Sequence, residues 1–320
     1  MNLINEKMID EYVKKFNFKQ MLILPVILLI VSLSILAYTS YTTRTPEGLG
    51  APVKLGMEFQ GGTAITFDSS KTPEQLKEEF SAYPVVQARE YGGGNQKLLQ
   101  FGPMTESQLS DVINKINSEY SNPGQITQMG EVVSKALQGQ TLNAILFSFI
   151  GMAIVVFIIF RIFVPSIAVV ISAFADIVFA AAMMDVFGIV LSLGTVAALL
   201  MLIGYSVDTD ILLTTRLLKR KGELGDKIKD AMKTGMTMTL TTLAALIALF
   251  VVSSGSYLVS TFTRIDIIRD ISVVLIFGLI ADIINTWMTN VGILKWYLEK
   301  TGKTETRVEK PKNKKRRQAA

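Results

Sequence analysis

The chain has 320 residues, of which 50% are hydrophobic, and a mean hydropathy of +0.40. It is too apolar for an ordinary soluble domain, whereas 18% charged residues are too many for membrane helices alone. We therefore expect several membrane spans together with a water-soluble part. The absence of cysteine and histidine excludes disulfides and thiolate metal sites, and we expect no metal and no cofactor.

The first 38 residues predict a surface helix followed by a membrane span. Residues 1–20 carry apolar side chains at helical spacing among lysines, which is typical of an amphipathic helix at the cytoplasmic membrane surface. A polar leader to the span is the alternative. Residues 21–38 are almost unbroken apolar sequence, close to the ~20 residues that cross a bilayer.

Residues 39–140 are polar, contain many turn residues and predict a separate α+β domain. Helices are expected after the capping boxes that begin at Thr72 and Thr105. Strands are expected in four segments: Met57–Phe67, Tyr83–Arg89, Lys97–Phe101 and Gln125–Gly130. The resulting order of strands and helices is typical of a ferredoxin-like fold.

Five further apolar segments predict a bundle over residues 141–298, and with residues 21–38 they make six transmembrane helices. The five are 141–160, 165–187, 189–215, 234–254 and 268–296, and the second and third of them are joined tightly through Gly188.

Topology follows from the basic residues, because loops rich in lysine and arginine stay in the cytoplasm. The loop after residue 215 and the tail 299–320 are both basic. We therefore expect a multi-pass protein of the cell membrane with both termini in the cytoplasm and residues 39–140 outside. The tail either follows topology alone or also binds anionic lipid or ribosomal RNA; the net charge of +5 does not by itself predict a nucleic-acid partner, and we expect none.

Aspartates lie within the apolar segments, where an ionised carboxylate costs about 2.5–3.5 kcal/mol. They are Asp176, Asp185, Asp208, Asp210 and Asp282. Such residues commonly serve an ion path, a proton relay or a polar contact between helices. Because Asp208 and Asp210 point about 200° apart on a helix, only one can face the bundle interior. Gly204, four residues before Asp208, would let another helix approach that face, so we expect Asp208 inside and Asp210 near the cytoplasmic end.

The fifth and sixth spans carry further polar groups. Thr237 and Thr241, with Thr234, share one face and either line a hydrated path or bond their own backbone carbonyls. Lys233 either reaches the water interface or turns inward toward an aspartate. The sixth span has a polar stripe that should face other helices, formed by Gly278, Asp282, Asn285, Thr286 and Asn290. Since no GxxxxGK[ST] phosphate loop is present, an ion gradient is the expected energy source.

Two motifs resemble the SecF family of protein-export membrane proteins, within the SecD/SecF group of the resistance-nodulation-division superfamily. Gly56-Met57-Glu58-Phe59-Gln60-Gly61-Gly62-Thr63 is similar to the segment that opens the family's external domain. Ile203-Gly204-Tyr205-Ser206 is similar to its fourth-span motif. The following Val207-Asp208-Thr209-Asp210 differs from bacterial members, whose aspartate would fall at Thr209, and resembles archaeal members.

The resemblance implies an auxiliary subunit of the Sec translocation machinery and no enzymatic activity. Such a subunit would pair with SecD, act beside the SecYE translocon and promote a late step of polypeptide export. The proton gradient would drive it through Asp208, with Asp176 at an aspartate position of the family and Lys233 at an arginine position.

Three other functions fit parts of the sequence. An intramembrane aspartyl protease could use Asp176 and Asp208, although Gly204–Asp208 is not the GxGD pattern of those enzymes. Half of a superfamily transporter from another pathway would also have six spans. A scaffold subunit without proton transport would use its aspartates only to bond helices together.

Overall fold

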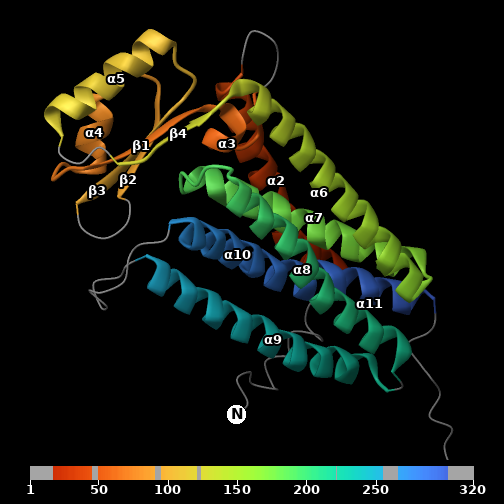
Figure 1. Cartoon of the computed structure of the whole chain (residues 1–320). Coiled ribbons are helices and arrows are strands. Elements are labelled where there is room, and N and C mark those ends of the chain that lie inside the picture. Colours follow the sequence, from red (N-terminus) through yellow and green to blue (C-terminus); the bar gives the residue numbers. More distant parts are fainter. Residues whose placement is uncertain are drawn as a thin grey trace, which may run out of the picture.

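The computed structural model describes residues 17–44, 50–90, 95–120, 124–220, 222–254 and 266–301. The amphipathic helix expected in residues 1–20 falls almost entirely outside these residues, as does the basic tail from residue 302. The described chain forms a small sheet domain at one end and a bundle of long helices that extends away from it (Figure 1).

The sheet domain contains four antiparallel strands in the order β2-β3-β1-β4. The strands are β1 (Gly62–Asp68), β2 (Val85–Glu90), β3 (Gln96–Phe101) and β4 (Ile126–Met129). Helices α4 (Pro73–Glu79) and α5 (Glu106–Glu119) lie on one side of the sheet (Figure 1). Both begin with the expected capping boxes, at Thr72 and Thr105. The core between the helices and the sheet consists of Ile65, Phe67, Leu76, Phe80, Leu99, Phe101, Val112 and Ile116.

The segment before β1 differs from the expected strand. Met57–Gln60 forms a helical turn, α3, and β1 begins only at Gly62. Gly61 and Gly62 have φ angles of +78° and +131°, a region that glycine enters without the steric cost of a Cβ. The two glycines thus mark the change from helix to strand, which is why the strand pattern does not continue back to Met57.

Five described helices are long and apolar enough to cross a membrane. They are α2 (Phe18–Thr42), α6 (Glu131–Phe160), α7 (Phe163–Val186), α8 (Leu193–Lys219) and α9 (Leu224–Ser253). A further helical stretch runs through α10 (Asp266–Ile284), the π-helical turn η1 (Asn285–Asn290) and α11 (Val291–Lys300). It contains more charged residues than those five, among them Arg269, Asp270 and Asp282. Helix α8 starts at Leu193 instead of directly after Gly188.

Helices α7, α8 and α10 pack against one another in the middle of the bundle. The apolar windows of α7 and α8 are 61% and 56% buried, whereas those of α6 and α9 are 6% and 11% buried. Gly278 allows α10 to approach α8 closely, because a Cβ there would lie 2.3 Å from Cδ2 of Leu202. Gly235 allows the same approach between α9 and the indole of Trp287. Polar groups on the sides of α7, α8 and α10 that face one another are consequently shielded from lipid by other helices.

Gly62 should not tolerate a larger residue. In Gly62→Ala the new Cβ would lie 2.0 Å from the carbonyl oxygen of Phe101 in the neighbouring strand, at a φ angle that costs alanine about 1–3 kcal/mol. We expect the α+β domain to lose at least about 2 kcal/mol of local stability, measured by hydrogen exchange on the purified full-length chain. Gly130→Ala is the matched control, since no atom lies within 4 Å of its Cβ position. Equal protection in both variants would contradict this account of Gly62.

Candidate functional site

Three aspartates from three helices have no exposed surface in the middle of the bundle. Asp176 lies on α7, Asp210 on α8 and Asp282 on α10, and each is 0% exposed. Among the described residues no lysine or arginine forms an ion pair with any of them. Their charges must therefore be offset by hydrogen bonds or by protons.

Asp176 joins α7 to both of its neighbours. Oγ of Ser206 donates a hydrogen bond to Oδ2 of Asp176 at 2.6 Å, and Nδ2 of Asn285 donates to Oδ1 at 2.7 Å. All three side chains are buried. Ser206, which belongs to the fourth-span motif, therefore holds the α7 carboxyl, while Asn285 reaches it from η1.

The hydroxyl of Thr286 is shared by the other two carboxyls. Its Oγ1 lies 2.7 Å from Oδ1 of Asp210 and 3.1 Å from Oδ1 of Asp282. A threonine hydroxyl has one hydrogen, so it can donate to only one of these oxygens. The second hydrogen bond forms only when that carboxyl carries a proton and donates it to Thr286. Both bonds together thus require one proton on the pair.

Several buried polar atoms around the carboxyls make no well-formed hydrogen bond to any residue that the structure describes. Oδ2 of Asp210 and Oδ2 of Asp282 are two of them. The others are Oγ of Ser172, Oγ1 of Thr214, Oγ1 of Thr289, and both amide atoms of Asn290. A buried polar atom without a partner costs about 1–3 kcal/mol, so a cluster of them is not a feature of simple helix packing. We call Asp176, Asp210 and Asp282, with these polar neighbours, the carboxyl cluster.

The expected choice between the two α8 aspartates was wrong. Asp210 is buried with Thr286, whereas Asp208 is exposed on the opposite face of α8. The prediction rested on Gly204, but no atom lies within 4 Å of its Cβ position, so none of the described helices approaches there. The close approaches occur at Gly278 and Gly235 instead. Asp208 and Asp176 accordingly do not form the pair that an aspartyl protease would need.

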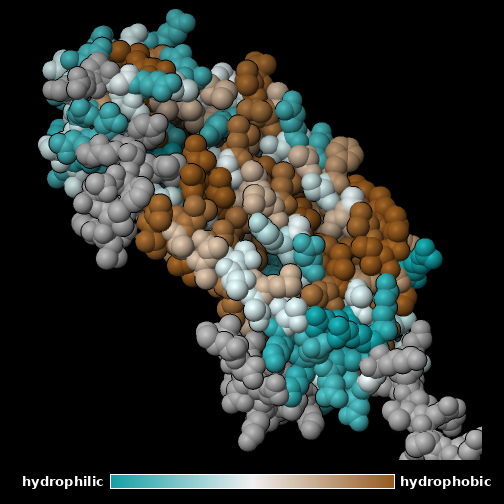
Figure 2. Space-filling view, turned by 60° about the horizontal axis from the view of Figure 1, so that its bottom comes forward, coloured by the Kyte–Doolittle hydropathy of each residue, from teal (hydrophilic) through white to brown (hydrophobic). Residues whose placement is uncertain are grey.

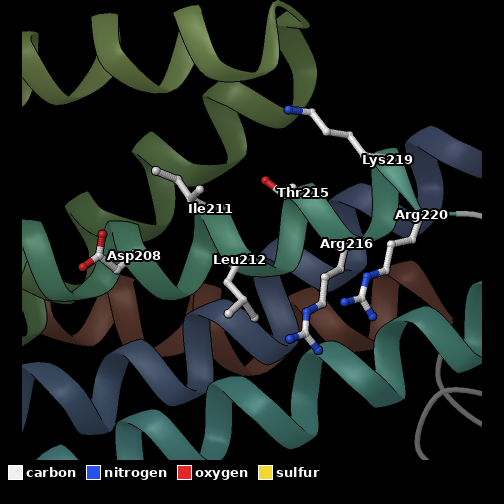
Figure 3. Close-up of a pocket in the computed structure, with 7 residues that line it drawn as sticks. All are labelled: Asp208, Ile211, Leu212, Thr215, Arg216, Lys219 and Arg220. Atoms are coloured by element: carbon white, nitrogen blue, oxygen red, sulfur yellow. The ribbon is translucent and has the colours of Figure 1, made fainter.

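Asp208 lies at one end of an open groove along α8, with a volume of about 400 Å³ (Figure 3). The groove is lined by Asp208, Ile211, Leu212, Thr215, Arg216, Lys219 and Arg220. Arg216 and Arg220 extend from α8 toward the neighbouring helix (Figure 3), and both pair with Asp230 on α9. Arg216 therefore pairs with Asp230 of the neighbouring helix and not with Asp210.

The polar residues predicted on α9 lie outside the carboxyl cluster. Thr237 and Thr241 are exposed and donate their hydroxyl hydrogens to backbone carbonyls one turn earlier, those of Lys233 and Thr237. Lys233 is exposed as well. Of the two alternatives for the threonines, the structure favours bonding to their own helix.

The polar stripe that was expected to face other helices lies on a buried face of α10 and η1. Asp282, Asn285, Thr286 and Asn290 are all buried. Sequence reasoning missed the π-helical turn that carries the last three, a feature that often occurs at functional sites. It also missed Ser172 and Thr214, which lie one helical turn from Asp176 and Asp210 and could have been found from that spacing.

The remaining motif residues have other positions. Gly61, Gly62 and Thr63 lead into β1, where Thr63 is 5% exposed. Gly204 and Tyr205 lie on the exposed side of α8 with Asp208. Thr209, where bacterial relatives would have their aspartate, is buried beside Asp210 in sequence but bonds the backbone of its own helix.

Comparisons with known proteins match this chain to protein-export membrane proteins. The family model for protein export membrane protein SecD/SecF, C-terminal, matches residues 108–300. SecF of Methanolacinia petrolearia is 48% identical over 91% of this chain and 98% of its own length. SecF of Pyrococcus furiosus is 37% identical over 93% of this chain and 97% of its own length.

One solved structure supports the fold. SecDF from Thermus thermophilus, described as a translocon-associated membrane protein, aligns with 92% of this chain at a TM-score of 0.64 and 17% identity. The present chain spans 38% of that SecDF chain. By its family match and by relatives that it covers almost end to end, the chain belongs to the SecF family of protein-export membrane proteins.

Proposed function

We propose that this protein is an auxiliary subunit of the Sec machinery that pairs with SecD and promotes late export of polypeptides across the cell membrane. Relatives named protein-export membrane protein SecF, 37–48% identical over most of the chain, support the assignment. We further propose that the carboxyl cluster couples this work to the proton gradient. The observation that carries the coupling is the single hydroxyl of Thr286 between two buried carboxyls.

The proton would load on the Asp210–Asp282 pair. In the described part of the chain neither carboxyl forms an ion pair, and each keeps one oxygen without a well-formed hydrogen bond. Buried waters typically make about three hydrogen bonds to polar groups of this kind, so water is the natural partner for these oxygens and for Asn290. A chain of such waters would let a proton reach the pair and leave it. Asp210 thus takes the part that the sequence suggested for Asp208.

A scaffold subunit without proton transport is the second candidate. The hydrogen bonds of Asp176 to Ser206 and Asn285 support it, because they join α7, α8 and η1 as polar contacts between membrane helices do. The two functions differ in what they need from Asp210. A scaffold needs a hydrogen-bond acceptor, which asparagine also provides, whereas a proton carrier needs a titrating group. A half-transporter of another pathway would also need a titrating group at Asp210.

The proposed topology has six spans, with α10, η1 and α11 together as the sixth. Asp282 lies on their buried polar face, and the other charged residues of this stretch lie near its two ends. Hydrophilic residues gather at the end of the bundle away from the sheet domain (Figure 2), where Arg216, Lys219 and Arg220 lie. Because basic residues stay inside the cell, we place this end and both termini in the cytoplasm.

The sheet domain would then lie outside the cell. Its order β1-α4-β2-β3-α5-β4 and its antiparallel sheet support a ferredoxin-like fold. We propose that this domain holds the emerging polypeptide, next to SecYE, and that the basic tail contacts anionic lipid.

The exposed face of α8 is the proposed contact with SecD. Asp208 is exposed on a helix that is otherwise suited to lipid, and Gly204 and Tyr205 lie on the same side. A charged group in lipid is costly, whereas a polar partner helix would satisfy it, and Gly204 leaves room for close approach. The present chain spans only part of the SecDF chain that it resembles. This supports a separate SecD chain that binds at the exposed face of α8.

Asp210→Asn should abolish proton-coupled export while leaving the fold intact. The amide still accepts a hydrogen bond from Thr286 but cannot carry the proton, so we expect export in cells to fall at least about tenfold, in line with the loss of a group essential to a proton relay. The measurement is the rate at which a secreted reporter appears outside the cell. Thr286→Ser, which keeps the shared hydroxyl, is the control and should export normally. Normal export in Asp210→Asn would favour the scaffold function.

A photo-crosslinker at Tyr205 should attach to SecD. Tyr205 is 39% exposed on the proposed contact face of α8. Ile27, 51% exposed on α2, is the control, because α2 packs mainly on α7. We expect the Tyr205 probe, and not the Ile27 probe, to give a product containing SecD on electrophoresis after illumination of membranes. The reverse pattern would contradict the proposed face.

A further inference from the structure

The segment Val53–Thr63 connects the sheet domain to the turn between α7 and α8. This turn, Phe187–Ser192, joins the two helices that carry Asp176 and Asp210. At its other end the segment enters β1 through α3 and the two glycines. Figure 1 shows α3 at the junction between the sheet and the long helices. We call Val53–Thr63 the junction segment.

The junction segment and the turn are held together by backbone hydrogen bonds. The amide of Leu191 donates to the carbonyl of Lys54 at 2.7 Å, and the amide of Gly56 donates to the carbonyl of Leu191 at 2.8 Å. Together they form a parallel bridge between Leu55 and Leu191. Val53 packs in the same core cluster as residues of α7, α8 and α10. The junction segment is thus part of the packed bundle as well as the start of the sheet.

Two residues make this contact specific. A Cβ on Gly56 would lie 2.7 Å from the carbonyl oxygen of Leu191, so only glycine permits the bridge. Asp185, at the end of α7, is 8% exposed, and its Oδ1 accepts a hydrogen bond from the amide of Lys54 at 3.1 Å. Its Oδ2 makes no hydrogen bond to any described residue. The carboxyl of Asp185 therefore acts here as an acceptor for the junction segment and lies outside the carboxyl cluster.

The α7–α8 turn is the point at which a shift of α7 or α8 would be passed on to the sheet domain. Asp185 is nine residues, about 14 Å of helix, from Asp176 on the same rigid element. Packed helices transmit a change of position along their length. On its other side the junction segment is bonded to α6, because Nε2 of Gln138 donates a hydrogen bond to the carbonyl oxygen of Phe59.

We propose that the junction segment transmits movement between the α7–α8 turn and the sheet domain, with Gly56 and Asp185 as positioning residues. The inference rests on the proposed function, because it needs a carboxyl cluster whose charge state moves α7 or α8. Because the bridge between Leu55 and Leu191 joins the two segments, β1 then moves together with the turn. If the bridge only anchored the sheet domain, breaking it would not change how the domain responds to a proton gradient.

The test follows the distance between the sheet domain and the bundle. The chain has no cysteine, so cysteines introduced at Ser107 on α5 and Leu142 on α6 give a unique spin-labelled pair in this subunit. The complex with SecD is placed in vesicles, and the distance is measured by pulsed electron resonance with and without an imposed proton gradient. Gly56→Ala and Asp185→Ala should lose at least half of the gradient-dependent change in distance, and export should fall with it.

Two matched variants should keep the full response. Gly130→Ala makes the same substitution where no atom is within 4 Å. Asp185→Asn retains an acceptor for the amide of Lys54 but removes the titrating group. If Asp185 were itself a proton carrier, Asp185→Asn would fail like Asp185→Ala, and its role as a positioning residue would be wrong. In a chain without the two labelled cysteines, a disulfide between Leu55→Cys and Leu191→Cys should restore export in Asp185→Ala.

The outcomes separate this inference from the proposed function. A full response in both Gly56→Ala and Asp185→Ala overturns the transmission, and if Asp210→Asn still abolishes the response, the proton coupling stands. If the distance between the two spin labels in the wild-type complex does not change with the gradient, both the transmission and the proton coupling are wrong. Should Gly56→Ala fail to fold, Asp185→Ala and its rescue by the disulfide decide the question.

Discussion

The structure depends on how three carboxyls are buried without a cation. A buried charge is tolerated only when hydrogen bonds or protons compensate it. Asp176 has two hydrogen-bond donors, from Ser206 and Asn285, whereas Asp210 and Asp282 share the single hydrogen of Thr286. The arrangement is complete only with a proton on the pair. Around this requirement, α7, α8 and α10 form the centre of the bundle, and α6 and α9 remain largely exposed.

The rest of the molecule positions and uses this centre. Gly278 and Gly235 let helices approach closely enough to exclude lipid from the polar groups. The π-helical turn places Asn285 and Thr286 against carboxyls on two different helices. At the other end of α7, Asp185 and Leu191 bond to the segment that begins the sheet. A change in the carboxyl cluster therefore has a continuous packed route to the α+β domain.

Much of this could be predicted from local patterns. The capping boxes at Thr72 and Thr105 gave correct helix starts, because they depend on residues three positions apart. The buried polar stripe of α10 and η1 followed from helical spacing. Which of Asp208 and Asp210 faces inward could not be predicted, because it depends on where α10 packs, and Gly204 pointed to the wrong face. The pairing of Leu55 with Leu191 joins residues far apart in sequence and left no local pattern.

The most direct test of the central claim is infrared difference spectroscopy of the carboxyl groups in the purified chain at neutral pH. Asp210→Asn and Asp282→Asn serve to assign the signal. The account predicts a band of a protonated carboxylic acid in the wild-type protein that shifts when Thr286 is replaced by valine and changes in both asparagine variants. A spectrum in which every aspartate of the cluster is ionised, with no such band, would contradict it.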